Sequence, residues 1–248
     1  MNKKTITTIL VSLVLVLAII FLFMFVFKKP VSQNEANKNV SKQASDAASE
    51  LLKINRTALA QTPNGELPVI SATDNISGDI KAGVQVIVYE NLNDVYSSKL
   101  NETLKQVKAL YADKIVIAYR PFVFKGDTLG FNSAVAVSCA AEQGKFLEMR
   151  DLILADTASS SLTMVNFSGY VKSLDMDKAK FSACLSADAS VTAVNSVIDK
   201  VANSMVFGSP TTFVNGELVV GARSFDDGQD TNGKKLEGLK SIVARHLQ

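Results

Sequence analysis

Histidine, cysteine and tryptophan are almost missing from this sequence. Its 248 residues include one histidine, two cysteines and no tryptophan. With His246 as the only imidazole, we expect neither a serine–histidine–aspartate relay nor a histidine-rich metal site. Gly126 and Gly130 are not followed by the lysine and hydroxyl residue of a phosphate-binding loop. The sequence therefore predicts no metal site and no cofactor.

A strong excess of charge of either sign is also missing. The chain has 26 Lys and Arg against 24 Asp and Glu, which gives a net charge of +2. No basic run is interleaved with aromatic residues, as it would be in a protein that follows a phosphate backbone. Nucleic acid is therefore not an expected partner.

One segment lacks charge altogether and is strongly hydrophobic. Residues 6–27 contain only apolar and small hydroxyl side chains. At about 1.5 Å per residue, a helix of this length crosses a hydrocarbon core of about 30 Å. Lys28, Lys29 and Pro30 follow it, with no small-residue cleavage pattern. We predict an uncleaved single-pass signal anchor in the cell membrane, with residues 1–5 inside and the C-terminal domain on the extracytoplasmic side.

The next segment has the composition of a spacer. Residues 28–78 are rich in Ser, Asn, Ala, Gln and Lys and poor in aromatic residues, so they bury too little apolar surface to fold alone. They are expected to form a flexible linker, within which residues 44–60 have the pattern of a short helix. The folded domain is expected to occupy residues 79–248.

The hydrophobic pattern of that domain predicts an α/β fold. A β-branched strand at 84–89, a helix from Asp94 and a strand at 114–119 form a β-α-β unit. Helical periodicity then predicts about five helices, in an insertion at about 126–206. Strands at 210–214 and 218–221 flank an Asn-Gly turn, and residues 235–246 have the pattern of a closing helix.

This order of elements, together with the stretch Gly-Ser-Pro-Thr-Thr-Phe-Val-Asn-Gly at 208–216, resembles the DsbA-like branch of the thioredoxin superfamily. Residues 140–146, 181–185 and 219–223 match the same family, and the resemblance covers the chain from Val84 onward. It implies a thioredoxin fold with a helical insertion, and a cis peptide bond before Pro210. It also implies that an extended peptide binds beside Tyr96, Ser209, Pro210 and Thr211.

The sequence departs from the family at the redox motif. Members of the family carry Cys-x-x-Cys at the start of the first helix, where the helix dipole lowers the pKa of the attacking thiol. This chain has Asp94, Val95, Tyr96 and Ser97 there. A carboxylate can cap the helix but cannot form a mixed disulfide. We therefore expect no catalytic residue at this position.

The two cysteines lie elsewhere, in the predicted helical insertion. Cys139 and Cys184 match family positions that often hold a second, non-catalytic pair, and exported domains keep disulfides. The resemblance implies a structural disulfide between them. Two buried, reduced thiols and a displaced redox pair are the alternatives.

Three functions follow from these observations. The first is a redox-inactive domain, tethered to a membrane, that binds an extended peptide or a partner protein. The second is a thiol-disulfide oxidoreductase or isomerase that acts in extracytoplasmic disulfide formation. The third is a purely structural envelope domain.

Overall fold

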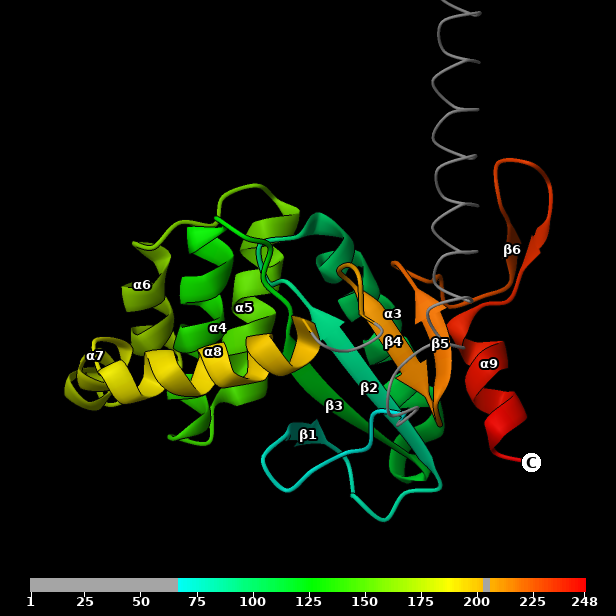
Figure 1. The fold of residues 1–248 in the computed structure, drawn as a ribbon, viewed down its shortest axis with the longest axis horizontal. Helices are drawn as coiled ribbons and strands as arrows, with labels where there is room; N and C mark the ends of the chain where they lie inside the picture. Colours follow the sequence, from blue (N-terminus) through cyan, green and yellow to red (C-terminus); the bar gives the residue numbers. More distant parts are fainter. Residues whose placement is uncertain (1–66, 203–205) are drawn as a thin grey trace, which may run out of the picture. The chain divides into compact units, whose positions relative to one another are not determined.

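The structure is a computed structural model that describes residues 67–202 and 206–248, shown in Figure 1. All of these residues belong to one compact unit. The predicted membrane span at 6–27 and the predicted helix at 44–60 lie outside the described residues. The topology and the site below therefore concern the domain alone.

A five-stranded mixed sheet forms the centre of the domain. Its strand order is β1-β3-β2-β4-β5; β2 and β3 are parallel, and the other neighbouring pairs are antiparallel. A separate two-stranded hairpin pairs β6 with β7. The strands are β1 (Asn75–Ser77), β2 (Val84–Glu90), β3 (Ile115–Pro121), β4 (Thr211–Val214), β5 (Glu217–Val220), β6 (Gly228–Gln229) and β7 (Lys235–Leu236).

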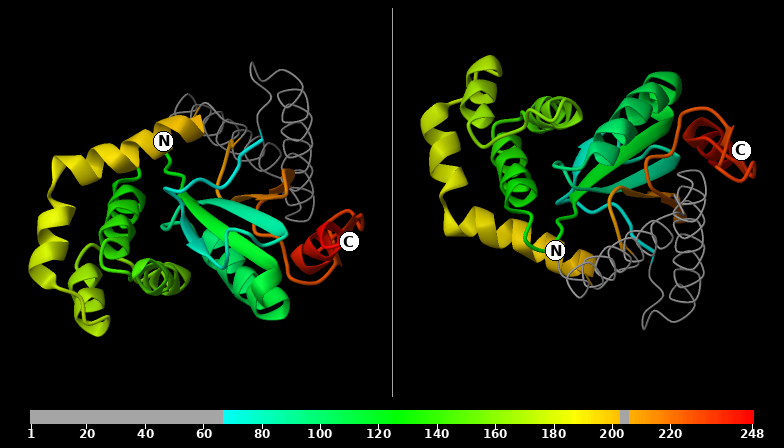
Figure 2. Two further views of the ribbon diagram at one scale, coloured as in Figure 1. Left: turned by 90° about the horizontal axis from the view of Figure 1, so that it is seen from below. Right: turned by 90° about the horizontal axis from the view of Figure 1, so that it is seen from above.

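Five helices lie between β3 and β4 in the chain, and Figures 1 and 2 show them gathered on the side of the sheet away from α9. The predicted thioredoxin-like α/β fold is therefore confirmed, with its helical insertion between the two halves of the sheet. The helices are α3 (Val95–Tyr111), a 3-10 turn η1 (Ala112–Lys114), α4 (Thr128–Ala141), α5 (Phe146–Ala158), α6 (Asn166–Ser173), α7 (Lys178–Leu185), α8 (Asp188–Ala202) and α9 (Leu239–His246).

The alternation of side chains along β2 divides the core between the two faces of the sheet. Val84, Val86 and Val88 pack with the apolar residues of α3 and α9. Ile87 and Tyr89 point to the opposite face, where Val201 of α8 packs. The helical insertion has a third apolar cluster of its own. These cores hold the end of β2, and with it the start of α3, in a fixed position.

Two boundaries differ from the prediction. β1 lies within the segment assigned to the flexible linker, and it pairs with the edge of β3. Its three residues are too few for a visible strand pattern. The helix predicted at 235–246 begins only at Leu239, because Lys235–Leu236 pairs in the hairpin. Gly238 precedes the helix at a place where a Cβ atom would lie 2.3 Å from the backbone of Asp226.

Candidate functional site

The first helix starts directly after the central strand β2. Asp94 is the N-cap of α3, and its carboxylate accepts a hydrogen bond of 2.9 Å from the backbone N–H of Tyr96. This bond satisfies one of the N–H groups that an α-helix leaves without a partner at its start. A negative charge at this end of a helix is also favoured by the helix dipole.

A chain of hydroxyl groups connects this helix to the loop before β4. Ser97 Oγ lies 2.9 Å from Ser209 Oγ, although the two residues are 112 positions apart. The N–H of Asn91 donates to Ser209 Oγ at 2.8 Å, so the Ser209 hydroxyl can donate to Ser97. The Ser97 hydroxyl can in turn donate to Asp94 at 3.5 Å. Ser97 is fully buried, so its hydroxyl serves packing rather than attack on a ligand.

The loop before β4 brings Ser209 and Pro210 to the start of α3. The Ser209–Pro210 peptide bond is cis, the geometry that the resemblance implies. Pro210 is buried and its carbonyl accepts from the N–H of Gly221 at 2.9 Å. Thr211 is buried too, and its hydroxyl donates to the Gly208 carbonyl at 2.7 Å. Within the described part of the chain, the backbone N–H and C=O of Ser209 make no hydrogen bond.

Exposed apolar side chains occur at the start of α3 and in the segments before α4 and β4. Tyr96 is 57% exposed and Phe207 61% exposed, and Val95 and Phe124 are exposed as well. Val95 and Phe124 border a shallow depression of about 480 Å³ beside Asp94. We refer to Val95, Tyr96, Phe124, Phe207 and Ser209 as the α3 face. Clustered exposed apolar residues of this kind are typical of a surface that binds another polypeptide.

A polar network that the sequence did not reveal supports the α3 face. The side chains of Asn91 and Asn93 donate to the Asp127 carboxylate at 2.7 and 3.0 Å, and Gly130 N–H donates at 2.8 Å. Burial alone would raise the pKa of Asp127, but these hydrogen bonds hold that pKa below its ordinary value. The position of Asp127 before a helix suggests capping. Its link to Asn91, 36 residues earlier, has no signal in the sequence.

The predicted disulfide is present. Cys139 of α4 and Cys184 of α7 are joined, and the described residues contain no free cysteine. Cys139 is fully buried in the core of the helical insertion, while Cys184 is partly buried with its sulfur 3.3 Å from Ser190 Oγ. Both sulfurs therefore belong to the insertion and are not part of the α3 face.

The His246 ring already has a partner, and the described residues form no metal site. The ring of His246, on α9, lies 2.8 Å from the Glu217 carboxylate, and Glu217 also binds Arg245. No group of three His, Cys, Asp or Glu side chains within residues 67–202 and 206–248 has the arrangement of a metal site. The same residues contain no single helix that is both long and apolar enough to cross a membrane, although the bent pair of α7 and α8 passes that test jointly.

A second buried polar group lies beneath the end of β2. Arg150 of α5 binds both carboxylate oxygens of Glu90, at 2.5 and 2.6 Å, and its Nη1 donates to Asn101 at 2.6 Å. The guanidinium also stacks 4.1 Å from the centre of the Tyr119 ring. Burial raises the pKa of Tyr119 to about 12, with Arg150 acting in the opposite direction. The sequence did not identify this network, because its members come from four separate elements.

Comparison with known proteins agrees with this topology. A thioredoxin family model, Thioredoxin_4, matches residues 71–231. Among curated proteins, the Na(+)/H(+) antiporter NhaA 3 of Salinispora tropica is 28% identical over 151 residues, which cover 60% of this chain and 23% of the antiporter. The chain therefore spans less than a quarter of the length of that curated relative.

Two solved structures share the fold. Alpha-DsbA1 of Wolbachia pipientis aligns with a TM-score of 0.58 and 15% identity, over 75% of this chain and 96% of that chain. A linker-deletion mutant of ScsC from Proteus mirabilis aligns with a TM-score of 0.60 and 17% identity, over 89% and 97%. Because the family model matches more than half of the residues, the chain belongs to the thioredoxin family, and its fold is that of DsbA-like proteins.

Proposed function

We propose that this protein is a redox-inactive binding module, held at the extracytoplasmic face of a membrane, that binds an extended polypeptide along the α3 face. One observation carries the proposal. The chain places a capping carboxylate and a buried hydroxyl at the start of α3, where disulfide exchange would need a thiolate. Oxygen at this position retains the favourable electrostatics of the helix start but has no redox couple.

The α3 face has the features that strand addition needs. Ser209 has a backbone N–H and C=O without partners in the described structure, at the end of the loop that leads into β4. Exposed Tyr96 precedes Ser97, whose hydroxyl contacts Ser209, and exposed Phe207 lies two residues before Ser209, so both rings are available to the side chains of a bound strand. Backbone pairing gives such a complex affinity, and the aromatic residues give it contact area. Of the residues that the resemblance implies for peptide contact, Pro210 and Thr211 are buried, so Tyr96 and Ser209 are the ones open to a ligand.

Membrane attachment is part of the same proposal. The predicted span at residues 6–27 supports it, and so does the similarity to part of a membrane antiporter. A tethered module would keep its bound polypeptide close to the membrane surface. The bound polypeptide would therefore have a high effective concentration with respect to other proteins in that membrane.

Peptide binding by the full chain tests the proposal. The ligand is a fluorescent, permanently unfolded polypeptide without cysteine, and the readout is anisotropy. Substituting Tyr96→Ser and Phe207→Ser together removes two aromatic contacts and should weaken binding by tenfold or more. Leu110→Ser, at the other end of α3 and similarly exposed, is the matched control and should leave affinity unchanged. Equal affinity in all three proteins, or no binding by the unmodified chain, would refute the proposal.

A second function is favoured by one observation, the disulfide itself. Cys184 is only partly buried, so the disulfide is closer to solvent on the Cys184 side than on the fully buried Cys139 side. In this second function the chain would be a thiol-disulfide oxidoreductase that works through Cys139 and Cys184. Such a protein would lose its activity when both cysteines are replaced by serine, whereas the binding module would keep its affinity for the cysteine-free polypeptide.

A further inference from the structure

A cavity separate from the α3 face lies between the sheet and the helical insertion. Its volume is about 370 Å³, which is within the range of small-molecule sites in proteins. It shares no residue with the α3 face. The ends of β2 and β3 border it on one side, and α4 and α8 border it on the other.

The walls of this cavity are mainly apolar. Leu92, Tyr119, Ala134, Val137 and Val194 are buried and line it. None of them carries a charge, and Tyr119 is the only one with a polar group. Placing an alkyl group among these side chains removes apolar surface from water, which is the main driving force for binding at such a site.

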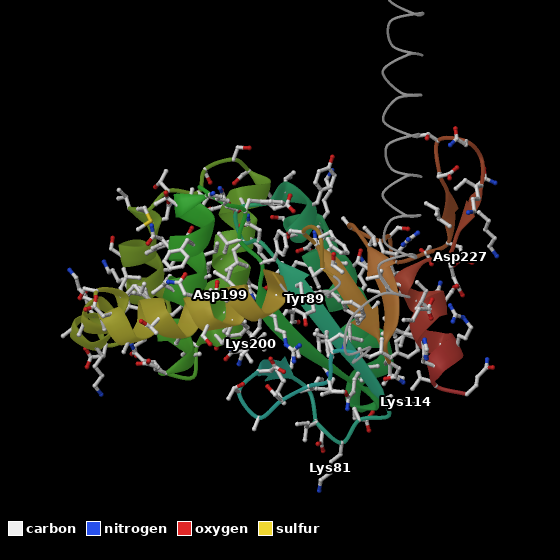
Figure 3. All side chains as sticks on the ribbon, in the orientation of Figure 1. Lys81, Tyr89, Lys114, Asp199, Lys200 and Asp227 are labelled. Atoms are coloured by element: carbon white, nitrogen blue, oxygen red, sulfur yellow. A yellow bond between two sulfur atoms is a disulfide. The ribbon has the colours of Figure 1, made fainter. Side chains whose placement is uncertain are left out.

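The charges at the edge of the cavity are neutralised in pairs, with one exception. Glu90 forms a two-bond ion pair with Arg150, and Asp74 forms one with Arg120, at 2.8 and 2.7 Å. Lys200 also lines the cavity, but it has no hydrogen bond or ion pair in the part of the chain that the structure describes. Figure 3 shows it near the end of α8 that approaches the sheet. The cavity thus has apolar walls and one uncompensated positive charge at its rim.

We propose that this cavity binds a single-chain amphiphile with a carboxylate head, such as a medium-length fatty acid. The alkyl chain would lie among Leu92, Val137 and Val194, and the carboxylate would pair with Lys200. A volume of about 370 Å³ suits one chain and leaves no room for the second chain of a phospholipid. A neutral ligand would leave the Lys200 charge unused, and a cationic ligand would be repelled by it.

The absence of tryptophan allows a sharp test on the full chain. Ser196→Trp places the only indole on an exposed position of α8 that lines the cavity. Decanoate with bromine on its terminal carbon should quench this fluorescence saturably. Val165→Trp, on a highly exposed loop outside the cavity, is the matched control. Both proteins are held in lipid nanodiscs, and an excess of decanoate without bromine should reverse quenching at the cavity but not quenching by acid dissolved in the bilayer.

The length and the charge of the ligand are then varied. Octanoate should bind on the order of tenfold more weakly than decanoate, because two fewer methylene groups are buried. Lys200→Gln should weaken the binding of decanoate roughly threefold to fivefold, as expected for the loss of one ion pair at the rim of the cavity. The same substitution should leave the affinity for decanol unchanged. Lys200→Arg should restore decanoate binding, and Lys172→Gln on α6 should have no effect.

Each contrary result overturns the proposal. Equal quenching of the Ser196→Trp and Val165→Trp proteins would show that the cavity binds nothing. Quenching by a brominated phospholipid in the bilayer, with none by the free acid, would show that the ligand is not a single-chain amphiphile. Identical affinities of the Lys200→Gln and unmodified cavities for decanoate would exclude the carboxylate. These outcomes do not depend on peptide binding at the α3 face.

Discussion

At the start of α3, the Asp94 carboxylate caps the helix. Asp94→Ala removes the acceptor for the Tyr96 N–H, so we expect the free energy of unfolding to fall by about 1 kcal/mol. Asp94→Asn keeps an oxygen acceptor and should stay within a few tenths of a kcal/mol of the unmodified protein. Urea unfolding monitored by circular dichroism measures both changes. Equal midpoints for Asp94→Ala and the unmodified protein would show that Asp94 does not cap the helix.

The Asp127 carboxylate makes stability depend on pH. Its pKa in the folded protein lies below the ordinary value of 3.8, so its ionised form stabilises the fold above that value. This contribution is lost as the pH falls through the folded-state pKa. Asp127→Asn should therefore show a smaller loss of unfolding free energy below pH 4 than the unmodified protein. Asn91→Ala, which removes one donor to Asp127, should have the same effect to a smaller extent.

The matching measurement is a series of urea titrations between pH 2 and pH 7. Above about pH 5 the difference in unfolding free energy between the Asp127→Asn variant and the unmodified protein should be constant, because Asp127 is then ionised in both the folded and the unfolded chain. A difference that grows as the pH rises from 5 to 7 would contradict the assignment.

Single substitutions in the buried pair of Arg150 and Glu90 are expected to lower the free energy of unfolding strongly. Arg150→Met leaves the Glu90 carboxylate buried without a cation, which should cost about 3 to 5 kcal/mol of unfolding free energy. The double variant Glu90→Leu and Arg150→Met removes both charges and should be much closer to the unmodified protein. A double-mutant cycle on these variants measures the coupling. Additive effects of the two substitutions would contradict the pairing.

At the scale of elements, the disulfide joins the first and fourth helices of the insertion. Cys139 and Cys184 close a loop with a sequence separation of 45 residues, which corresponds to about 4 kcal/mol in the chain-entropy model. The double variant Cys139→Ala and Cys184→Ala should lose a stability of this order. Dithiothreitol should lower the melting temperature of the unmodified protein and leave that of the double variant unchanged. A melting temperature that does not respond to dithiothreitol would show that the bond is not formed in solution.

Which elements the sequence predicted depends on how local their signals are. The β-branched run of β2, the Asn215–Gly216 turn and the amphipathic helices of the insertion follow from short patterns, and all are present. β1 was missed because three residues are too short for a periodicity. Strand β7 was predicted as the first turn of the closing helix, because a strand of two residues has no apolar periodicity of its own.

For the whole domain, the sequence predicted the fold through a family resemblance and predicted the site only in part. Through the resemblance it indicated that Tyr96 and the Ser209–Pro210 stretch belong to one peptide site, and the contact of 2.9 Å between the Ser97 and Ser209 hydroxyls places the start of α3 beside that stretch. It did not indicate Asn91 and Asp127, or Arg150 and Glu90, because these pairs join separate elements and need a known tertiary arrangement. It also missed the cavity beside Lys200, which exists only once the sheet and the insertion are packed together.

The most direct measurement of the central proposal is thiol-disulfide exchange by the full chain. Insulin reduction is followed for the unmodified protein, for the Cys139→Ser and Cys184→Ser double variant, and for an Asp94→Cys and Ser97→Cys double variant as positive control. We expect no turnover above background in the first two proteins, and turnover in the third, because only the third has a thiol at the start of α3. Turnover by the unmodified protein that disappears in the serine variant would show that the domain is an oxidoreductase and not a redox-inactive binding module.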